Sequence, residues 1–149
     1  MIVIDTHVLV WWLTRAPGLS RKAERTLAAH GDPGQIVVSA ISLLEIATAV
    51  RRGRLELSIP LDQWLADINS LPEIRIEPVS ADIAALAGSL AEPMHGDPAD
   101  RLIVSTAFTL GVSLVTNRNT IIIDASTAHR TASGWTYGFP EMDKGQRAA

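Results

Sequence analysis

Met1-Ile2-Val3-Ile4-Asp5-Thr6-His7 is the stretch that decides the fold, because a wholly apolar run stops abruptly at a carboxylate. A short apolar run of this kind is typical of a strand buried on both faces, as in the centre of a parallel sheet. The apolar run 8–13 that follows predicts a helix packed back on that sheet. Asp5 therefore falls at the carboxyl end of a central strand, the edge where open α/β sheets bind ligands. Asp5 fits a helix N-cap equally well, and both roles stay open at this point.

Apolar runs and helix signals alternate along the rest of the chain. Further strands are predicted at 36–38, 74–78, 113–115 and 135–137. Those at 74–78 and 135–137 are expected to be edge strands. Helices are predicted at 20–30, 39–52, 60–70, 80–91 and 97–110, and 121–123 fits either a short helix or a strand. Strands alternating with helices at this spacing predict an α/β protein, with a parallel sheet covered by helices on both faces.

Length and composition bound the function. With 149 residues, we expect one domain over 1–142 and a polar tail over 143–149. The absence of cysteine excludes disulfides and thiolate zinc sites and suits a reducing cytoplasm. Asp5 and His7 interrupt the first apolar run, so we expect no signal peptide, and no stretch is long enough to span a membrane. The net charge of −3 means that any nucleic-acid partner must be bound by local basic groups.

Acidic residues lie at three predicted strand-to-helix junctions: Asp5, Glu45, and the pair Asp97 and Asp100. An N-cap explains Asp97, which precedes a proline, as well as it explains Asp5. Glu45 follows Ser42 at the spacing of a capping box, and Asp100 fits a favourable acid in the first helical turn. These structural roles need no ligand.

The structural roles are weaker for Glu45 and Asp100. The preceding strand ends at Val38, so Ser39 is the expected N-cap and Glu45 falls one turn inside the helix. Asp100 shares a helical face with three apolar residues that should point at the sheet. These are Ile103, Ala107 and Leu110. We therefore expect an acid on a buried face, which solvation does not explain.

Convergence of these acids at one edge of the sheet would have a chemical consequence. Two ionised carboxylates about 5 Å apart repel by about 3 kcal/mol at an effective dielectric near 20. Such a cluster is tolerable when its pKa values rise or when a divalent cation neutralises it. Oxygen-only ligands select Mg²⁺ or Mn²⁺. The reaction that uses such a site is in-line attack of a metal-activated water on a phosphodiester.

Three segments in this order resemble PIN-domain ribonucleases, and in particular the VapC toxins of bacterial toxin–antitoxin pairs. They are Ile2-Val3-Ile4-Asp5-Thr6-His7-Val8-Leu9, Val38-Ser39-Ala40-Ile41-Ser42-Leu43-Leu44-Glu45-Ile46 and His95-Gly96-Asp97-Pro98-Ala99-Asp100-Arg101-Leu102-Ile103-Val104. The similarity extends over nearly the whole chain, to Leu114-Val115-Thr116. The resemblance implies a three-layer α/β/α sandwich with a short, mainly parallel central sheet. It also implies Mg²⁺- or Mn²⁺-dependent endonucleolytic cleavage of RNA and an antitoxin partner, a small DNA-binding protein.

Site residues follow from the resemblance position by position. It implies that Asp5, Glu45 and Asp100 are the catalytic acids that hold the metal. Asp97 is a further candidate for the same catalytic and metal site, with the N-cap role as its alternative. Thr6, beside the first acid, is a candidate substrate contact.

One position departs from the family pattern. Two residues beyond Thr116 the resemblance implies an acid, but Arg118 stands there, followed by Asn119. Arginine cannot bind a cation, although it can hold a phosphate oxygen bidentately. Thr116 or Asn119 could instead supply a neutral ligand or orient a water, and we count all three among the substrate-binding candidates. The departure also raises the alternative of a PIN-like domain that binds RNA or a partner without cleaving. A haloacid-dehalogenase-type phosphatase is disfavoured, because His7 stands where that class needs a second aspartate.

The first predicted helix also carries excess apolar surface. Residues 8–13 are apolar around most of the circumference, whereas a helix on a sheet buries only a stripe. We expect Trp11 or Trp12 to stay exposed in the monomer and to form a partner interface, with burial in the core as the alternative. The resemblance implies two uses for this surface, a homodimer contact and an antitoxin groove. Arg51, Arg52 and Arg54 fit either RNA phosphates or a solvated helix end.

Overall fold

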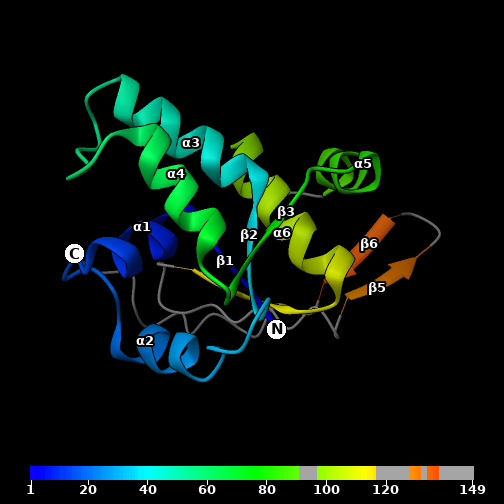
Figure 1. Ribbon diagram of the computed structural model, residues 1–149. Coiled ribbons are helices and arrows are strands. Elements are labelled where there is room, and N and C mark those ends of the chain that lie inside the picture. Colours follow the sequence, from blue (N-terminus) through cyan, green and yellow to red (C-terminus); the bar gives the residue numbers. More distant parts are fainter. Residues whose placement is uncertain (91–96, 117–127, 132–133, 138–149) are drawn as a thin grey trace, which may run out of the picture.

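The computed structural model describes residues 1–90, 97–116, 128–131 and 134–137 (Figure 1). Helices and strands alternate along the first 116 residues, and a hairpin follows. In chain order the elements are β1 (Ile2–Ile4), α1 (Thr6–Thr14), α2 (Arg21–Ala28), β2 (Ile36–Ser39), α3 (Ala40–Arg51), α4 (Leu61–Ser70), β3 (Ile74–Glu77), α5 (Ala81–Ser89), α6 (Pro98–Leu110), β4 (Ser113–Val115), β5 (Ala128–Thr131) and β6 (Gly134–Tyr137).

The central sheet is parallel and has the strand order β3-β2-β1-β4. The strand β1 is therefore flanked on both sides, and all three of its residues are buried. Its alternate side chains enter two separate cores: Ile2 and Ile4 belong to one, and Val3 to the other. The strand β3 lies at an edge, as its alternating sequence predicts.

The two cores define the layers. The core around Ile4 is completed by buried residues of α1, α2, α3 and α4, whereas the core around Val3 is completed by α6 and by Leu90 after α5. Figure 1 shows the helices arranged around the central strands, with α1 and α2 on the opposite side of the picture from α5. The predicted three-layer α/β/α sandwich with a parallel sheet is confirmed.

The helices α2 and α5 begin at the predicted caps. Ser20 Oγ accepts the backbone N–H of Ala23, and Ser80 Oγ accepts that of Ile83, each at 3.2 Å. The helix α6 ends at Gly111, whose φ of 65° is the left-handed conformation that favours glycine. Local capping signals therefore set these boundaries.

The predicted strand at 135–137 exists but does not extend the main sheet. It lies within β6, which pairs antiparallel with β5 in a separate two-stranded sheet. Residues 121–123 and the tail 143–149 lie outside the described residues. In the described part of the chain, every helix is too short or too polar to cross a membrane.

Candidate active-site groove

Strand register brings polar residues together at the carboxyl edge of the sheet. Ile4 is paired with Val38 on one side and Val115 on the other. The next residue of each strand is therefore aligned: Asp5 lies between Ser39 and Thr116. The backbone N–H of Asp5 donates to the carbonyl of Val115 at 3.1 Å, which continues the pairing beyond β1. This edge is where the sequence predicts the site.

A groove of about 770 Å³ opens beside this edge, and we call it the acid groove. It lies between α1 and α3 and reaches the first turn of α6. Its wall from α1 includes Thr6, His7 and Trp11, and α3 contributes Glu45. Asp97 lines it from the start of α6. Two predicted site acids from distant segments thus face one groove.

Glu45 has the perturbed titration that a site acid should show. Burial raises the pKa of Glu45 above its ordinary 4.5, and the negative charges of Asp97 and Asp100 raise it further. A hydrogen bond from Thr6 and the charge of His7 lower it again, but the net direction is upward. The N-cap residue Asp97 and the first-turn residue Asp100 of α6 are therefore near enough for their charges to act on Glu45.

Two hydroxyl side chains form a hydrogen-bonded chain that ends at the carboxylate of Glu45. Thr6 Oγ1 is hydrogen-bonded to Glu45 Oε2 and also lies 2.9 Å from the Oγ of buried Ser42. A hydroxyl has one proton and a carboxylate is the stronger acceptor, so Thr6 donates to Glu45 and Ser42 donates to Thr6. Ser42 lies inside α3, whose N-cap is Ser39, so it is not the N-cap of a capping box.

Sequence reasoning missed this network and a second hydroxyl pair next to it. Thr106 Oγ1, in α6, donates to the carbonyl of Leu102 and lies 3.4 Å from Ser39 Oγ. Ser39, Ser42 and Thr106 are each fully buried. The signal that could have revealed them is a small hydroxyl residue within otherwise apolar helix faces, since buried hydroxyls need partners.

The structural and the chemical roles coexist at Asp5 and Asp97. Asp5 Oδ1 accepts the N–H of Val8 at 2.8 Å, and Asp97 Oδ1 accepts that of Ala99 at 3.0 Å, so both residues are N-caps. Each cap bond uses one carboxylate oxygen. Among the described residues, no three acidic or histidine side chains are grouped closely enough to hold a metal ion.

The predicted environment of Asp100 is wrong. The sequence places it on the buried face of α6, but Asp100 is exposed, although Ile103 and Ala107 are buried as predicted. The buried stripe of α6 begins at Ala99, and Asp100 lies about 100° round the helix from that residue. Its charge still acts on Glu45. Exposure therefore removes the argument from burial but not the proximity to the groove.

Arg101, the neighbour of Asp100, ties α6 to α5. Its Nε donates to the carbonyl of Ala87 at 2.9 Å, and a terminal guanidinium nitrogen donates to that of Leu90. These are carbonyls at the C-terminal end of α5, where a cation is favourable. Arg101 thereby fixes the turn of α6 that carries Asp97 and Asp100.

The remaining substrate-binding candidates divide in two. Thr116 is described, and its buried Oγ1 has no hydrogen-bond partner in the part of the chain that the structure describes. Arg118 and Asn119 lie outside the described residues.

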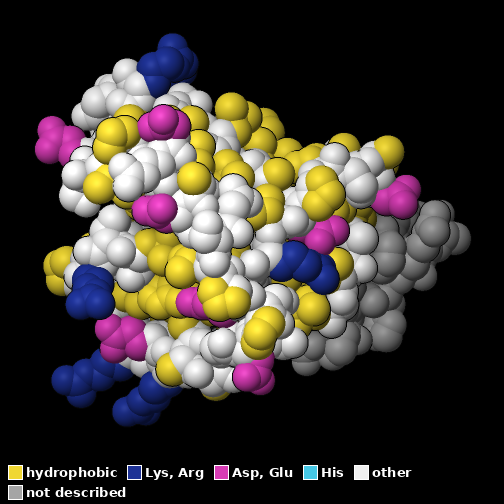
Figure 2. Space-filling view, viewed as in Figure 1, with side chains coloured by type: hydrophobic (Ala, Val, Ile, Leu, Met, Phe, Trp, Pro, Cys, Tyr) yellow, Lys and Arg dark blue, Asp and Glu magenta, His cyan; other side chains and the backbone are white. Residues whose placement is uncertain are grey.

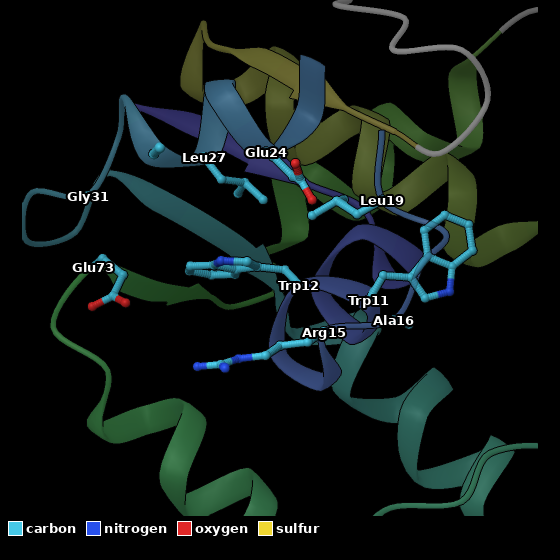
Figure 3. Close-up of a pocket in the computed structure, with 10 residues that line it drawn as sticks. Trp11, Trp12, Arg15, Ala16, Leu19, Glu24, Leu27, Gly31 and Glu73 are labelled. Carbon is cyan, nitrogen blue, oxygen red and sulfur yellow. The ribbon is translucent and has the colours of Figure 1, made fainter. Parts of the chain in front are cut away.

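The two tryptophans of α1 point in opposite directions (Figure 3). Trp12 lies in a second hollow of about 510 Å³, which we call the aromatic cavity, with Leu27 and Glu73 on its walls. Trp11 lines both the aromatic cavity and the acid groove. Both tryptophans are half-buried, and Trp12 packs against the core.

Comparison with protein families decides the identity of this fold. The family described as PIN domain matches residues 2–126. The chain belongs to the PIN-domain family. This PIN domain is 36% identical to Ribonuclease VapC22 of Mycobacterium tuberculosis over 115 residues, which cover 77% of the present chain and 85% of that protein.

Solved structures share the fold of this PIN domain. FitAcB from Neisseria gonorrhoeae has a TM-score of 0.57 at 24% identity, covering 85% of this chain and 94% of the other. A toxin–antitoxin complex from Klebsiella pneumoniae has a TM-score of 0.55 at 24% identity, covering 83% and 90%. The predicted PIN-like architecture is confirmed.

Part of the chain is also similar to part of another class of protein. N-acetyl-gamma-glutamyl-phosphate reductase of Mesorhizobium japonicum is 68% identical over 38 residues, which are 26% of this chain and 12% of the reductase. Because the chain spans so little of the reductase's length, this local similarity does not extend that enzyme's activity to the PIN domain.

Proposed function

We propose that this PIN domain is a Mg²⁺- or Mn²⁺-dependent endoribonuclease and the toxin of a toxin–antitoxin pair. The observation that carries the proposal is that Glu45 and Asp97, from distant segments of the chain, line one groove, where burial and then the charges of Asp97 and Asp100 raise the pKa of Glu45. Support also comes from the similarity to a VapC ribonuclease over most of both chains.

The donor set fits a hard cation by its chemistry. Asp5, Glu45, Asp97 and Asp100 offer carboxylate oxygens, and the hydroxyl of Thr116, which has no partner among the described residues, follows the strand that pairs with β1. When bound, such a cation supplies an activated water for attack on the phosphodiester and stabilises the leaving oxygen. The chain's own contribution is to orient Glu45 through Thr6 and to hold the first turn of α6 through Arg101.

The test combines metal binding with cleavage. In the purified protein, Mn²⁺ at about 100 times its dissociation constant is expected to add about 2.7 kcal/mol to the free energy of unfolding. Asp5→Asn and Asp100→Asn are each expected to abolish this gain and RNA cleavage while the variants stay folded. A metal response that survives in both variants contradicts the assignment of the site.

A second candidate function rests on Arg118. With arginine in place of the acid that the family resemblance implies, a PIN domain that binds RNA or a partner without cutting is the competing proposal. We expect Arg118→Ala to weaken RNA binding but not metal binding. A strong rise in cleavage in Arg118→Asp, with RNA binding retained, would identify an impaired ancestral site instead.

We also propose an antitoxin partner and a homodimer. Trp11 and Trp12 are half-buried side chains of one helix and line the aromatic cavity, which offers an apolar surface of the kind that partners bind. An interface hot spot costs about 2 kcal/mol or more when truncated, so Trp11→Ala should weaken the antitoxin complex by that amount. Sedimentation of wild type and variant, with and without antitoxin, measures both associations.

A further inference from the structure

The acid groove has a basic end. Arg52 and Arg54 line it at the C-terminal end of α3, whereas Glu45 and Asp97 line it at the other end. Seven residues separate Glu45 from Arg52, so the two lie on the same face of α3 and about 10 Å apart along its axis. Arg51 follows Glu45 by six residues, faces about 120° away and does not line the groove. The helix therefore presents an acid and a cation to one groove.

The backbone around the basic end is fixed. Gly53 has a φ of 68°, and its N–H donates to the carbonyl of Val50 at 3.0 Å. The N–H of Arg54 donates to the carbonyl of Ala49 at 2.9 Å. These two bonds are those of a Schellman motif, which reverses the chain at a helix end. Arg54 is thus returned toward the groove by a defined turn and not by a free loop.

Neither arginine is neutralised within the described part of the chain. The ion pair found there joins Arg75 to Glu77, and no described carboxylate lies within 4.0 Å of Arg52 or Arg54. The protein is acidic overall, and Figure 2 shows Lys and Arg side chains scattered over one face and not gathered in a patch. Arg52 and Arg54 are exposed at the edge of the groove, so their guanidinium groups are accessible to an anion that enters it.

We propose that Arg52 and Arg54 form a subsite for a backbone phosphate of single-stranded RNA, about 10 Å along α3 from Glu45. The inference rests on the proposed ribonuclease function and extends it to the path of the substrate. Guanidinium groups bind phosphate oxygens bidentately. At about 3.4 Å per stacked nucleotide, the held phosphate lies within roughly three nucleotides of the scissile bond.

The aromatic side chains of α1 that line the groove favour single-stranded RNA over duplex RNA. Trp11 and His7 line the groove opposite α3, with ring centroids 6.0 Å apart and ring planes tilted by 59°. An unpaired base can place its face on such aromatic rings, whereas a base in a duplex is stacked on both sides. Between the two charged ends, Thr48 and Ala49 are small and leave room for the strand.

The test measures binding of a fluorescent single-stranded RNA by anisotropy in EDTA, where metal-dependent cleavage is prevented. The double variant Arg52→Ala/Arg54→Ala is expected to bind about tenfold more weakly and to lose about 0.7 from the slope of log K against log salt, the value for one phosphate contact on a single strand. Arg51→Ala, which removes one positive charge from the neighbouring position outside the groove, is the control and should change neither quantity. The single variants Arg52→Ala and Arg54→Ala, which match it in charge, should each weaken binding.

Each outcome decides one claim. If the double variant behaves like Arg51→Ala while wild type cuts RNA with Mn²⁺, the subsite is wrong and the ribonuclease proposal stands. If wild type cuts no RNA but the double variant alone loses affinity and slope, the subsite stands and the ribonuclease proposal fails. A blunt duplex of the same sequence is expected to bind wild type at least tenfold more weakly, and equal binding overturns the assignment to unpaired RNA.

Discussion

The acid groove and the aromatic cavity share the side chain of Trp11, and both have mixed polar and apolar linings. They differ in what their central side chain does: in the groove Thr6 orients the carboxylate of Glu45, whereas in the cavity the indole of Trp12 packs on the core. The difference teaches that the polar contacts of the proposed metal site and the core packing of the tryptophan are made by different side chains of one helix, so substitutions at the two should separate metal affinity from stability.

The largest effect on stability is expected on the cavity side. Trp12→Ala removes core contacts and should lower the free energy of unfolding by about 3 kcal/mol, the lower part of the range for Trp→Ala because the side chain is only half-buried. Urea denaturation measures the loss. Leu44→Ala, at a side chain that is 60% exposed, is the control and should change stability by less than about 0.5 kcal/mol. Equal losses of unfolding free energy in the two variants would contradict the role of Trp12 in the core.

The next largest effect on stability is expected next to Trp11, the side chain that lines both the groove and the cavity. A Cβ at Gly18 would lie 2.7–2.9 Å from three carbons of the Trp11 indole, so Gly18→Ala forces the ring to move. Overpacking of this kind is expected to cost about 2 kcal/mol. Gly88→Ala, where a Cβ meets nothing within 4 Å in α5, should instead stabilise the protein by about 0.5–1 kcal/mol. Thermal melting of both variants checks the opposite signs.

On the groove side, metal affinity should change strongly, together with a loss of about 1 kcal/mol in the free energy of unfolding, because the buried hydroxyl of Ser42 loses its partner. Thr6→Val keeps the shape of the side chain but removes the hydrogen bond that lowers the pKa of Glu45. Loss of a partner that orients a metal ligand typically weakens metal binding by about 10–100-fold. Thr26→Val, which removes a helix-surface hydroxyl in α2, is the control. Mn²⁺ titrations of both variants by calorimetry make the comparison, and equal affinities would remove Thr6 from the site.

The smallest effect is a pH dependence of stability. Because burial and the acids of α6 raise the pKa of Glu45 above 4.5, its charged form is disfavoured in the folded state. The stability from protonated Glu45 is fully present below pH 4.5 and is lost as the pH rises through the folded pKa. Glu45→Gln carries no charge at any pH.

In EDTA the melting temperature of Glu45→Gln should therefore exceed that of wild type at pH 8, and the difference should vanish toward pH 4. A difference that is the same at both pH values would mean that charge on Glu45 does not destabilise the fold. The same measurement in Mn²⁺ should narrow the gap at pH 8, since a cation offsets the repulsion.

Local signals predicted most of the fold. The apolar run ending at Asp5, the caps Ser20 and Ser80, and the glycine after α6 each act through nearest neighbours, so the sequence alone sets them. The separate pairing of β6 with β5 was not predicted, because a partner strand is a long-range choice.

The sequence predicted those parts of the site that depend on where strands end, but not those that depend on how helices pack. Junction positions placed Glu45 and Asp97 on one groove, because parallel strands end at a common edge. Periodicity misjudged Asp100, since a buried stripe is narrower than the face it lies on. The contacts that Thr6 and Arg101 make across 39 and 14 residues of sequence could not be predicted, because they depend on how helices pack.

The position of Trp11 between the two hollows has a thermodynamic consequence. An occupant of the aromatic cavity and an RNA strand in the groove would both contact the same indole. If either ligand favours one rotamer of that ring, it changes the affinity for the other, and linkage requires the two changes to be equal in factor. A single side chain is then enough for reciprocal coupling between partner and substrate, with no movement of the sheet.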